Sequence, residues 1–180
     1  MRQRTWIAVA VALMGCEPGE PGAYRGDVLL VGDSIMVTSS QALIQEGFRR
    51  GRHVEFNAHG ATPISTNVFF EDWTQTFWAP RSIALRVAGE SWECAALSLG
   101  TNDPMADPFD VISLDVGYLE PFWLLPLEAI RPGTRSLIQQ LIPAERILDV
   151  PYTLSADGLH PDAEGARMIA RAIFEACEGL

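Results

Sequence analysis

The chain has 180 residues, of which 48% are hydrophobic and 20% charged, so it is long enough and apolar enough for one globular domain with a full core. Its net charge of -10 argues against nucleic acid as a partner. All 13 basic residues are Arg, and the lack of Lys excludes a P-loop, a Schiff-base enzyme and a Ser-Lys dyad.

The first fifteen residues differ from the rest of the chain. Arg2 and Arg4 precede an apolar stretch over residues 6–14, which is too short to span a bilayer but has the length of a signal-peptide core. Residues 1–15 are therefore expected to be a signal peptide and to take no part in the fold.

The stretch Leu13–Cys16 resembles the lipobox of bacterial lipoproteins. The resemblance implies that Cys16 is lipidated, becomes the new N-terminus and anchors the protein to a bacterial membrane outside the cytoplasm. An ordinary secretory signal with a chance Cys is the alternative. Residues 16–25 are rich in Pro and Gly and are expected to form a tether to a domain over residues 26–180.

The most informative stretch of the domain runs from Asp27 to Ser34. Four consecutive apolar residues, Val28–Val31, predict a strand buried on both faces, and Gly32 allows a sharp turn after it. Ser34 is then expected to open a helix at the carboxyl edge of a sheet. Taken alone, this turn would be an ordinary polar turn with an N-capping serine.

Further elements alternate along the chain. Apolar residues at helical spacing (Met36, Leu43, Ile44 and Phe48) predict a helix over 34–48 that Gly51 ends, with Arg49–Arg52 as its solvated end. Residues 53–57 and 94–99 predict a second and a third strand, and residues 81–88 a helix between them. Alternation of this kind predicts a three-layer α/β domain with a mainly parallel sheet.

Residues 105–150 give weaker signals. Pro121 and Pro126 break the apolar stretch 118–130, which is expected to be an interrupted helix or a lid-like loop. Residues 136–141 are predicted as a strand, with a helix over 137–147 as the alternative, and residues 146–150 as a short strand. A clear helix follows with Pro161 at its first position. Its expected buried face consists of Ala166, Ile169, Ala170, Ile173 and Cys177.

Five polar or glycine positions are expected to meet at the carboxyl edge of this sheet. Ser34, Gly60 and Asn102 each follow a predicted strand, while Asp157 and His160 precede the last helix. Ligands of open α/β sheets bind at this edge. Each residue alone could be a turn brace or a helix cap, but together they are the groups that acyl transfer needs.

In that chemistry Ser34 is the nucleophile, His160 its general base and Asp157 the acid that orients the imidazole. The backbone N–H groups of Ser34 and Gly60 and the side-chain amide of Asn102 are candidate oxyanion-hole donors. Asp33, beside the serine, is left as a turn brace. Three His residues without ligand-like spacing predict no metal site, and no cofactor is expected.

The blocks Gly32–Ser34, Gly100–Asp103 and Asp157–Pro161, with Gly60 between the first two, resemble the SGNH hydrolase (GDSL-like esterase and lipase) superfamily. The resemblance implies a flavodoxin-like α/β/α fold and a serine esterase that forms an acyl-enzyme on Ser34, with the other residues in the roles just given. The interval from Asn102 to Asp157 looks short for the family, so the sheet is expected to be trimmed at that edge.

The substrate is less visible than the reaction. An acetylated carbohydrate or a lipid ester would suit, and two alternatives stay open: an acyltransferase of the same fold, or a non-catalytic surface lipoprotein that uses the fold as a binding module. Aromatic residues that could line an acyl or sugar site are expected to serve core packing instead. They are Phe69, Phe70, Trp73, Phe77, Trp78, Tyr118, Phe122 and Trp123.

Two cysteines are expected at the end of the domain opposite the catalytic residues. Cys94 starts the third predicted strand, and Cys177 lies near the end of the last helix, which runs back from the catalytic edge. In an oxidising compartment they could form a disulfide, and two separate buried thiols are the alternative.

Overall fold

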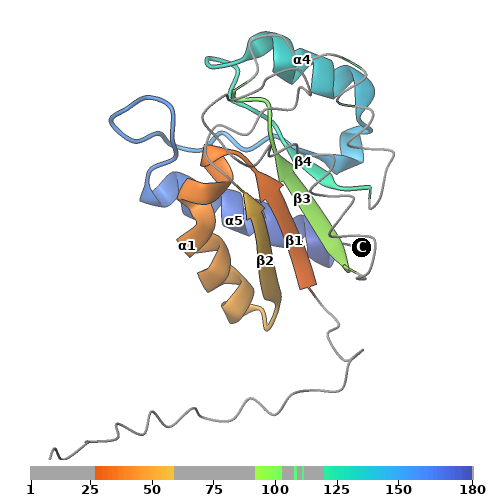
Figure 1. Ribbon diagram of the computed structural model, residues 1–180, viewed down its shortest axis with the longest axis vertical. Helices are drawn as coiled ribbons and strands as arrows, with labels where there is room; N and C mark the ends of the chain where they lie inside the picture. The colour runs from red at the N-terminus through yellow and green to blue at the C-terminus, as the bar shows by residue number, and fades with distance from the viewer. Residues whose placement is uncertain (1–26, 59–91, 103–107, 109–110, 112–119, 180) are drawn as a thin grey trace, which may run out of the picture.

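A computed structural model (Figure 1) describes residues 27–58, 92–102, 108, 111 and 120–179 of the chain. Its sheet has five parallel strands in the order β2-β1-β3-β4-β5. The strands are β1 (Asp27–Gly32), β2 (His53–Ala58), β3 (Cys94–Ser98), β4 (Phe122–Leu124) and β5 (Ile147–Leu148). The last two strands are the trimmed edge: both are present, but they have only 3 and 2 residues.

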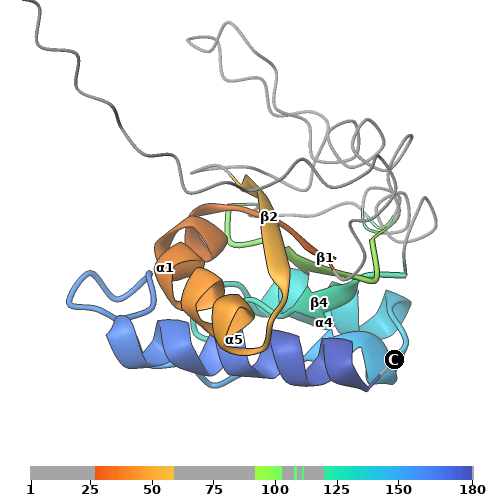
Figure 2. The same cartoon turned by 90° about the horizontal axis from the view of Figure 1, so that it is seen from below.

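Helices pack on both faces of the sheet, as the predicted three-layer fold requires. On one face, Val28 and Leu30 of β1 pack with buried residues of α1 (Ser34–Arg49) and α5 (Ala163–Glu178), which lie side by side in Figure 2. On the other face, Leu29 and Val31 pack with Ile138 of α4 (Pro132–Leu141). A short 3-10 helix, η1 (Ala144–Arg146), leads from α4 into β5.

The prediction for α1 is confirmed in its bounds but only partly in its buried face. Met36 and Leu43 are fully buried, whereas Ile44 and Phe48 are exposed. Gly51 follows the helix with a φ of 67°, a conformation that costs glycine little. The predicted second and third strands are β2 and β3.

Two predictions in the middle of the chain are wrong. The strand predicted over 136–141 is part of helix α4, which begins with Pro132 and buries Thr134 and Ile138, four residues apart. The predicted interrupted helix or loop contains strand β4, whose three residues are all buried. Pro121 and Pro126 lie just outside this strand, so they delimit an element instead of breaking one.

Helix α5 buries all five residues of its predicted face. Its N-cap is Asp162, whose side chain accepts a hydrogen bond of 2.7 Å from the Gly165 N–H. Pro161 therefore precedes the cap and does not occupy the first helical position, which corrects the prediction.

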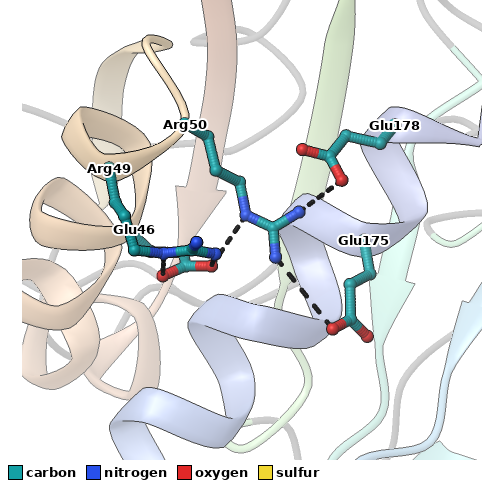
Figure 3. Close-up of polar contacts among 5 residues, drawn as sticks. All are labelled: Glu46, Arg49, Arg50, Glu175 and Glu178. Carbon is teal, nitrogen blue, oxygen red and sulfur yellow. Dashed lines mark hydrogen bonds and ion pairs between the residues drawn. The ribbon is translucent and has the colours of Figure 1, made fainter.

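The end of the molecule opposite the carboxyl edge of the sheet is held by covalent and ionic links. Cys94 and Cys177 form a disulfide with a Cα separation of 5.6 Å. Arg50 follows α1 and bonds to Glu46 of the same helix and to Glu178 of α5, with Glu175 at 4.0 Å (Figure 3). Only 10% of the Arg50 side chain is exposed, so this helix end is not simply solvated.

Candidate active site

Ser34 is the first residue of α1 and follows the turn at the end of β1. Gly32 makes this turn possible, because a Cβ there would lie 2.9 Å from the Ser98 carbonyl oxygen. The Asp33 N–H donates to that same oxygen at 2.9 Å, which ties the turn to β3. The Asp33 carboxylate is buried and caps α1 by accepting from the Ile35 N–H at 3.0 Å, so its predicted role as a turn brace is confirmed.

Asp157 and His160 lie in a loop that connects β5 to α5. The neck of the loop is closed by an antiparallel bridge between Leu154 and Pro161 and by a 2.8 Å bond from the Ser155 N–H to the His160 carbonyl oxygen. Gly158 allows the turn at the tip with a φ of 68°. In Figure 1 this blue loop lies at the end of the sheet where α1 begins.

Within this loop the predicted acid and base contact each other directly. One oxygen of Asp157, Oδ2, lies 2.7 Å from His160 Nδ1. The other, Oδ1, accepts from the Ser155 hydroxyl at 2.8 Å and from the Leu159 and His160 N–H groups at 2.9 Å each. These bonds, that of the His160 ring foremost, hold the pKa of Asp157 well below its ordinary value.

The contact determines which ring nitrogen of His160 can act as a base. A carboxylate can only accept, so Nδ1 carries the proton in this pairing and Nε2 of the neutral ring keeps its lone pair. The pair is open to solvent, because 29% of the His160 side chain and 50% of the Asp157 side chain are exposed.

Asn102 and Ser34 flank the point where the strand order reverses. Ser34 follows β1 and Asn102 follows β3. Strand β1 lies between β2 and β3 in the sheet, so the chain goes from β1 to β2 on one side and later adds β3 on the other side. Crevices at such switch points bind ligands in open α/β sheets. Asn102 is half-buried and follows the buried Thr101 in the chain.

The structure brings only part of the predicted constellation into contact. Asp157 bonds to His160, whereas no hydrogen bond joins Ser34 to His160 in the described part of the chain. Gly60 and Cys16 lie outside the described residues, as do Asp103, the predicted helix over 81–88 and six of the eight aromatic residues. The other two, Phe122 and Trp123, are buried in β4 and serve core packing, as predicted.

Two residues near the site are missing from the sequence prediction. Ser155 bonds to Asp157, and a hydroxyl residue two positions before an acid is the pattern that could have suggested it. Tyr152 is buried close to Asp33, and burial together with the charge of Asp33 raises the pKa of its hydroxyl above the ordinary value. The sequence around Tyr152 carries no comparable signal.

Two other kinds of site are absent from the described residues. Within residues 27–58, 92–102 and 120–179, no three His, Cys, Asp or Glu side chains gather in a way that could hold a metal ion. No helix in these ranges has the length and hydropathy that crossing a membrane requires.

The fold is similar to that of proteins of known structure. The sequence matches no protein-family model and no curated protein. The structure is similar to the C-terminal catalytic domain of peptidoglycan O-acetyltransferase A from Streptococcus pneumoniae, with a TM-score of 0.62 and 16% identity over 86% of this chain and 94% of that domain.

A second similar structure is a carbohydrate esterase family 2 enzyme with its carbohydrate-binding domain, from Corynascus thermopiles (Myceliophthora fergusii). Its TM-score is 0.56 with 15% identity, over 90% of this chain and 69% of that one. At such identities the likeness concerns the fold. The chain therefore has the α/β/α fold expected from its resemblance to the SGNH hydrolases, and it shares that fold with these two enzymes.

Proposed function

We propose that the protein is a serine esterase that cleaves a carboxylic ester through an acyl-enzyme on Ser34. The observation that carries the proposal is the 2.7 Å contact between Asp157 and His160, in a loop at the end of the sheet where Ser34 opens α1. An acid-oriented imidazole has a clear use beside a serine at a helix N-terminus, because the hydroxyl needs a base to become a nucleophile.

In the first half of the proposed reaction, Ser34 Oγ attacks the ester carbonyl carbon while His160 Nε2 takes the hydroxyl proton. The carbonyl oxygen becomes an oxyanion, for which the N–H groups of Ser34 and Gly60 and the amide of Asn102 are the proposed donors. The tetrahedral intermediate collapses, the C–O bond of the ester breaks, and the leaving alcohol takes the proton from His160. Catalytic hydrogen bonds are often long in unliganded enzymes, so the Ser34 to His160 bond is expected to form when substrate binds.

In the second half, a hydroxyl compound attacks the acyl group on Ser34 and gives its proton to His160, which returns it to Ser34 Oγ as the acyl bond breaks. Water as the attacking group gives an esterase. A sugar hydroxyl gives an acyltransferase, and this second candidate is supported by the similarity to the peptidoglycan O-acetyltransferase domain.

An O-acetylated carbohydrate is the substrate we favour. The two similar structures are the catalytic domain of a peptidoglycan O-acetyltransferase and a carbohydrate esterase. The exposure of His160 and Asp157 also suits a bulky or polymeric substrate better than a deep pocket would.

Hydrolysis of p-nitrophenyl acetate tests the proposal. Ser34→Ala and His160→Ala are each expected to lower kcat at least roughly 1,000-fold, because each removes a member of the proton relay. Ser40→Ala, on the same helix, and His53→Ala, at the opposite end of the sheet, are the matched controls and should retain the wild-type rate. No turnover by the wild type against a broad panel of esters would favour the binding module.

Product analysis separates the two enzyme candidates. With an acetyl donor alone, an esterase releases acetate at the full rate. Adding a sugar acceptor should leave the acetate yield unchanged for an esterase, and should divert acetyl groups to the sugar for an acyltransferase.

Membrane attachment through lipidated Cys16, outside the cytoplasm, is a separate part of the proposal. The Cys94–Cys177 disulfide supports the location outside the cytoplasm, because such bonds persist in oxidising compartments. Radiolabelled palmitate should enter the wild type and fail to enter Cys16→Ser. Absence of label in the wild type would leave an ordinary secretory signal.

A further inference from the structure

The two oxygens of the Asp157 carboxylate have different partners. Oδ2 contacts the His160 ring, while Oδ1 accepts three hydrogen bonds from within the loop. Two of the three donors are backbone N–H groups, of Leu159 and His160. The third is the Ser155 hydroxyl, at 2.8 Å, so Ser155 supplies the side-chain donor of this set.

Ser155 is held in place by its own backbone. Its N–H donates to the His160 carbonyl oxygen at 2.8 Å, and its carbonyl oxygen accepts from the Gly158 N–H at 3.1 Å. Ser155 thus lies across the neck of the loop from His160, and its side chain reaches the acid between them. The hydroxyl therefore bonds to Asp157 from a fixed position.

We propose that Ser155 is a positioning residue that fixes the orientation of the Asp157 carboxylate, and through it the His160 ring. The proposal rests on the proposed esterase function. With Oδ1 held by three donors, Oδ2 points to Nδ1 and keeps the ring in the tautomer that leaves Nε2 available. Without the hydroxyl, the two backbone donors remain, but the carboxylate can rotate and accept water instead.

A neighbouring hydroxyl provides a matched control. Thr153 donates to Asp162 Oδ1 at 2.6 Å, so the loop contains a second bond between a hydroxyl and a carboxylate. This one supports the N-cap of α5, because the same oxygen accepts from the Gly165 N–H. Loss of the Thr153 hydroxyl should affect stability without affecting the Asp157–His160 pair.

The test compares Ser155→Ala with Thr153→Ala by three measurements: kcat and KM for p-nitrophenyl acetate, thermal melting, and the far-downfield proton resonance of His160 Nδ1–H. Ser155→Ala should lower kcat roughly tenfold with KM unchanged, and should shift or broaden the resonance through faster exchange. Thr153→Ala should lower the melting temperature and leave kcat and the resonance as in the wild type. Asp157→Asn identifies the resonance by removing it.

A second pair of variants guards against misfolding. Ser155→Thr and Ser155→Val have nearly the same shape but differ in the hydroxyl, so Thr should restore the rate and the resonance and Val should not. Wild-type values of both in Ser155→Ala or Ser155→Val would overturn the proposal. If the wild type has no esterase activity, the proposed function fails, and the resonance alone still decides whether Ser155 orients the pair.

Discussion

The two oxygens of the Asp157 carboxylate have different partners, so one of them can be replaced while the bonds of the other are kept. In Asp157→Asn, the amide oxygen can take the place of Oδ1 and keep its three hydrogen bonds, so the loop should retain its shape. The amide nitrogen then faces His160 Nδ1 and cannot accept from it, which favours the wrong tautomer. We expect kcat to fall roughly 1,000- to 10,000-fold, with a nearly unchanged circular dichroism spectrum.

The same substitution at another aspartate, Asp149, is the control for Asp157→Asn. Asp149 is an exposed acid at the start of the same connection, before its neck at Leu154, and it pairs with Arg135. Asp149→Asn therefore removes a charge without removing a partner of the His160 ring. This variant should retain its kcat. Full activity in Asp157→Asn would mean that another acid, or none, orients the histidine.

At the scale of elements, the position of the loop depends on how closely it packs on α5. A Cβ at Gly165 would lie 2.2 Å from the Thr153 carbonyl oxygen, a backbone atom that cannot turn aside. Gly165→Ala should therefore push the loop off the helix and destabilise the protein by about 1–3 kcal/mol, measured by urea unfolding. Because Asp157 and His160 follow Thr153 in this loop, kcat should fall as well.

Gly133→Ala in helix α4 is the matched control for Gly165→Ala. Nothing lies within 4 Å of a Cβ at this position in α4, so Gly133→Ala should stabilise the protein by about 0.5–1 kcal/mol and leave kcat unchanged. If Gly165→Ala were equally harmless, the contact between the loop and α5 would not be what positions Asp157 and His160.

The same scale shows what could be predicted from the sequence. The strand at Val28–Val31 was predictable because a short continuous apolar run fits a buried strand. Helix α5 was predictable because its apolar residues recur every three or four positions, which fits a helix and not a strand. Leu137, Ile138 and Leu141 fit both a strand and a helix, so α4 was decided by packing against β1 and β3. Strand β4 has three residues and is defined by its pairing with distant β3.

For the site, too, the sequence predicted the residue types but not their geometry. The motif around Ser34, Asn102 and Asp157–Pro161 predicted the chemistry that we propose for the site, and the contact between Asp157 and His160 agrees with it. The geometry between its parts depends on loop conformation, which no local pattern encodes. Ser155 illustrates this: its hydroxyl became meaningful only once the turn brought it within 2.8 Å of Asp157.

At the scale of the whole molecule, a charged cluster joins α1 and α5 far from the site. Its members are Glu46, Arg49, Arg50, Glu175 and Glu178 (Figure 3). The hydrogen bond from Arg49 is the main reason that the pKa of Glu46 falls from 4.5 to about 2, against the opposing effect of burial and with help from Arg50. Arg50 also lies over the Phe174 ring, 6.0 Å from its centre.

A lowered pKa in the folded state means that ionised Glu46 stabilises the protein at pH values above its unfolded pKa, and that this contribution is lost as pH falls toward about 2. The difference in unfolding free energy between the wild type and Glu46→Gln should thus be constant near neutral pH and shrink between about pH 4.5 and 2. Urea unfolding over this range measures it. Glu145→Gln, outside the cluster, is the matched control for removal of one carboxylate. A difference for Glu46→Gln that does not change with pH would contradict the assignment.

The disulfide between Cys94 and Cys177 divides the chain into a covalently closed ring and an open arm. By joining Cys94 to Cys177, it closes a ring of chain that contains Asn102, Asp157 and His160, while Ser34 lies outside the ring on the β1-α1-β2 arm. A protease cut within the ring would leave both pieces linked until a reductant is added. A cut between β2 and β3 would separate the proposed nucleophile from its proposed base, leaving strand pairing and the packing of α1 on α5 to hold the two pieces together.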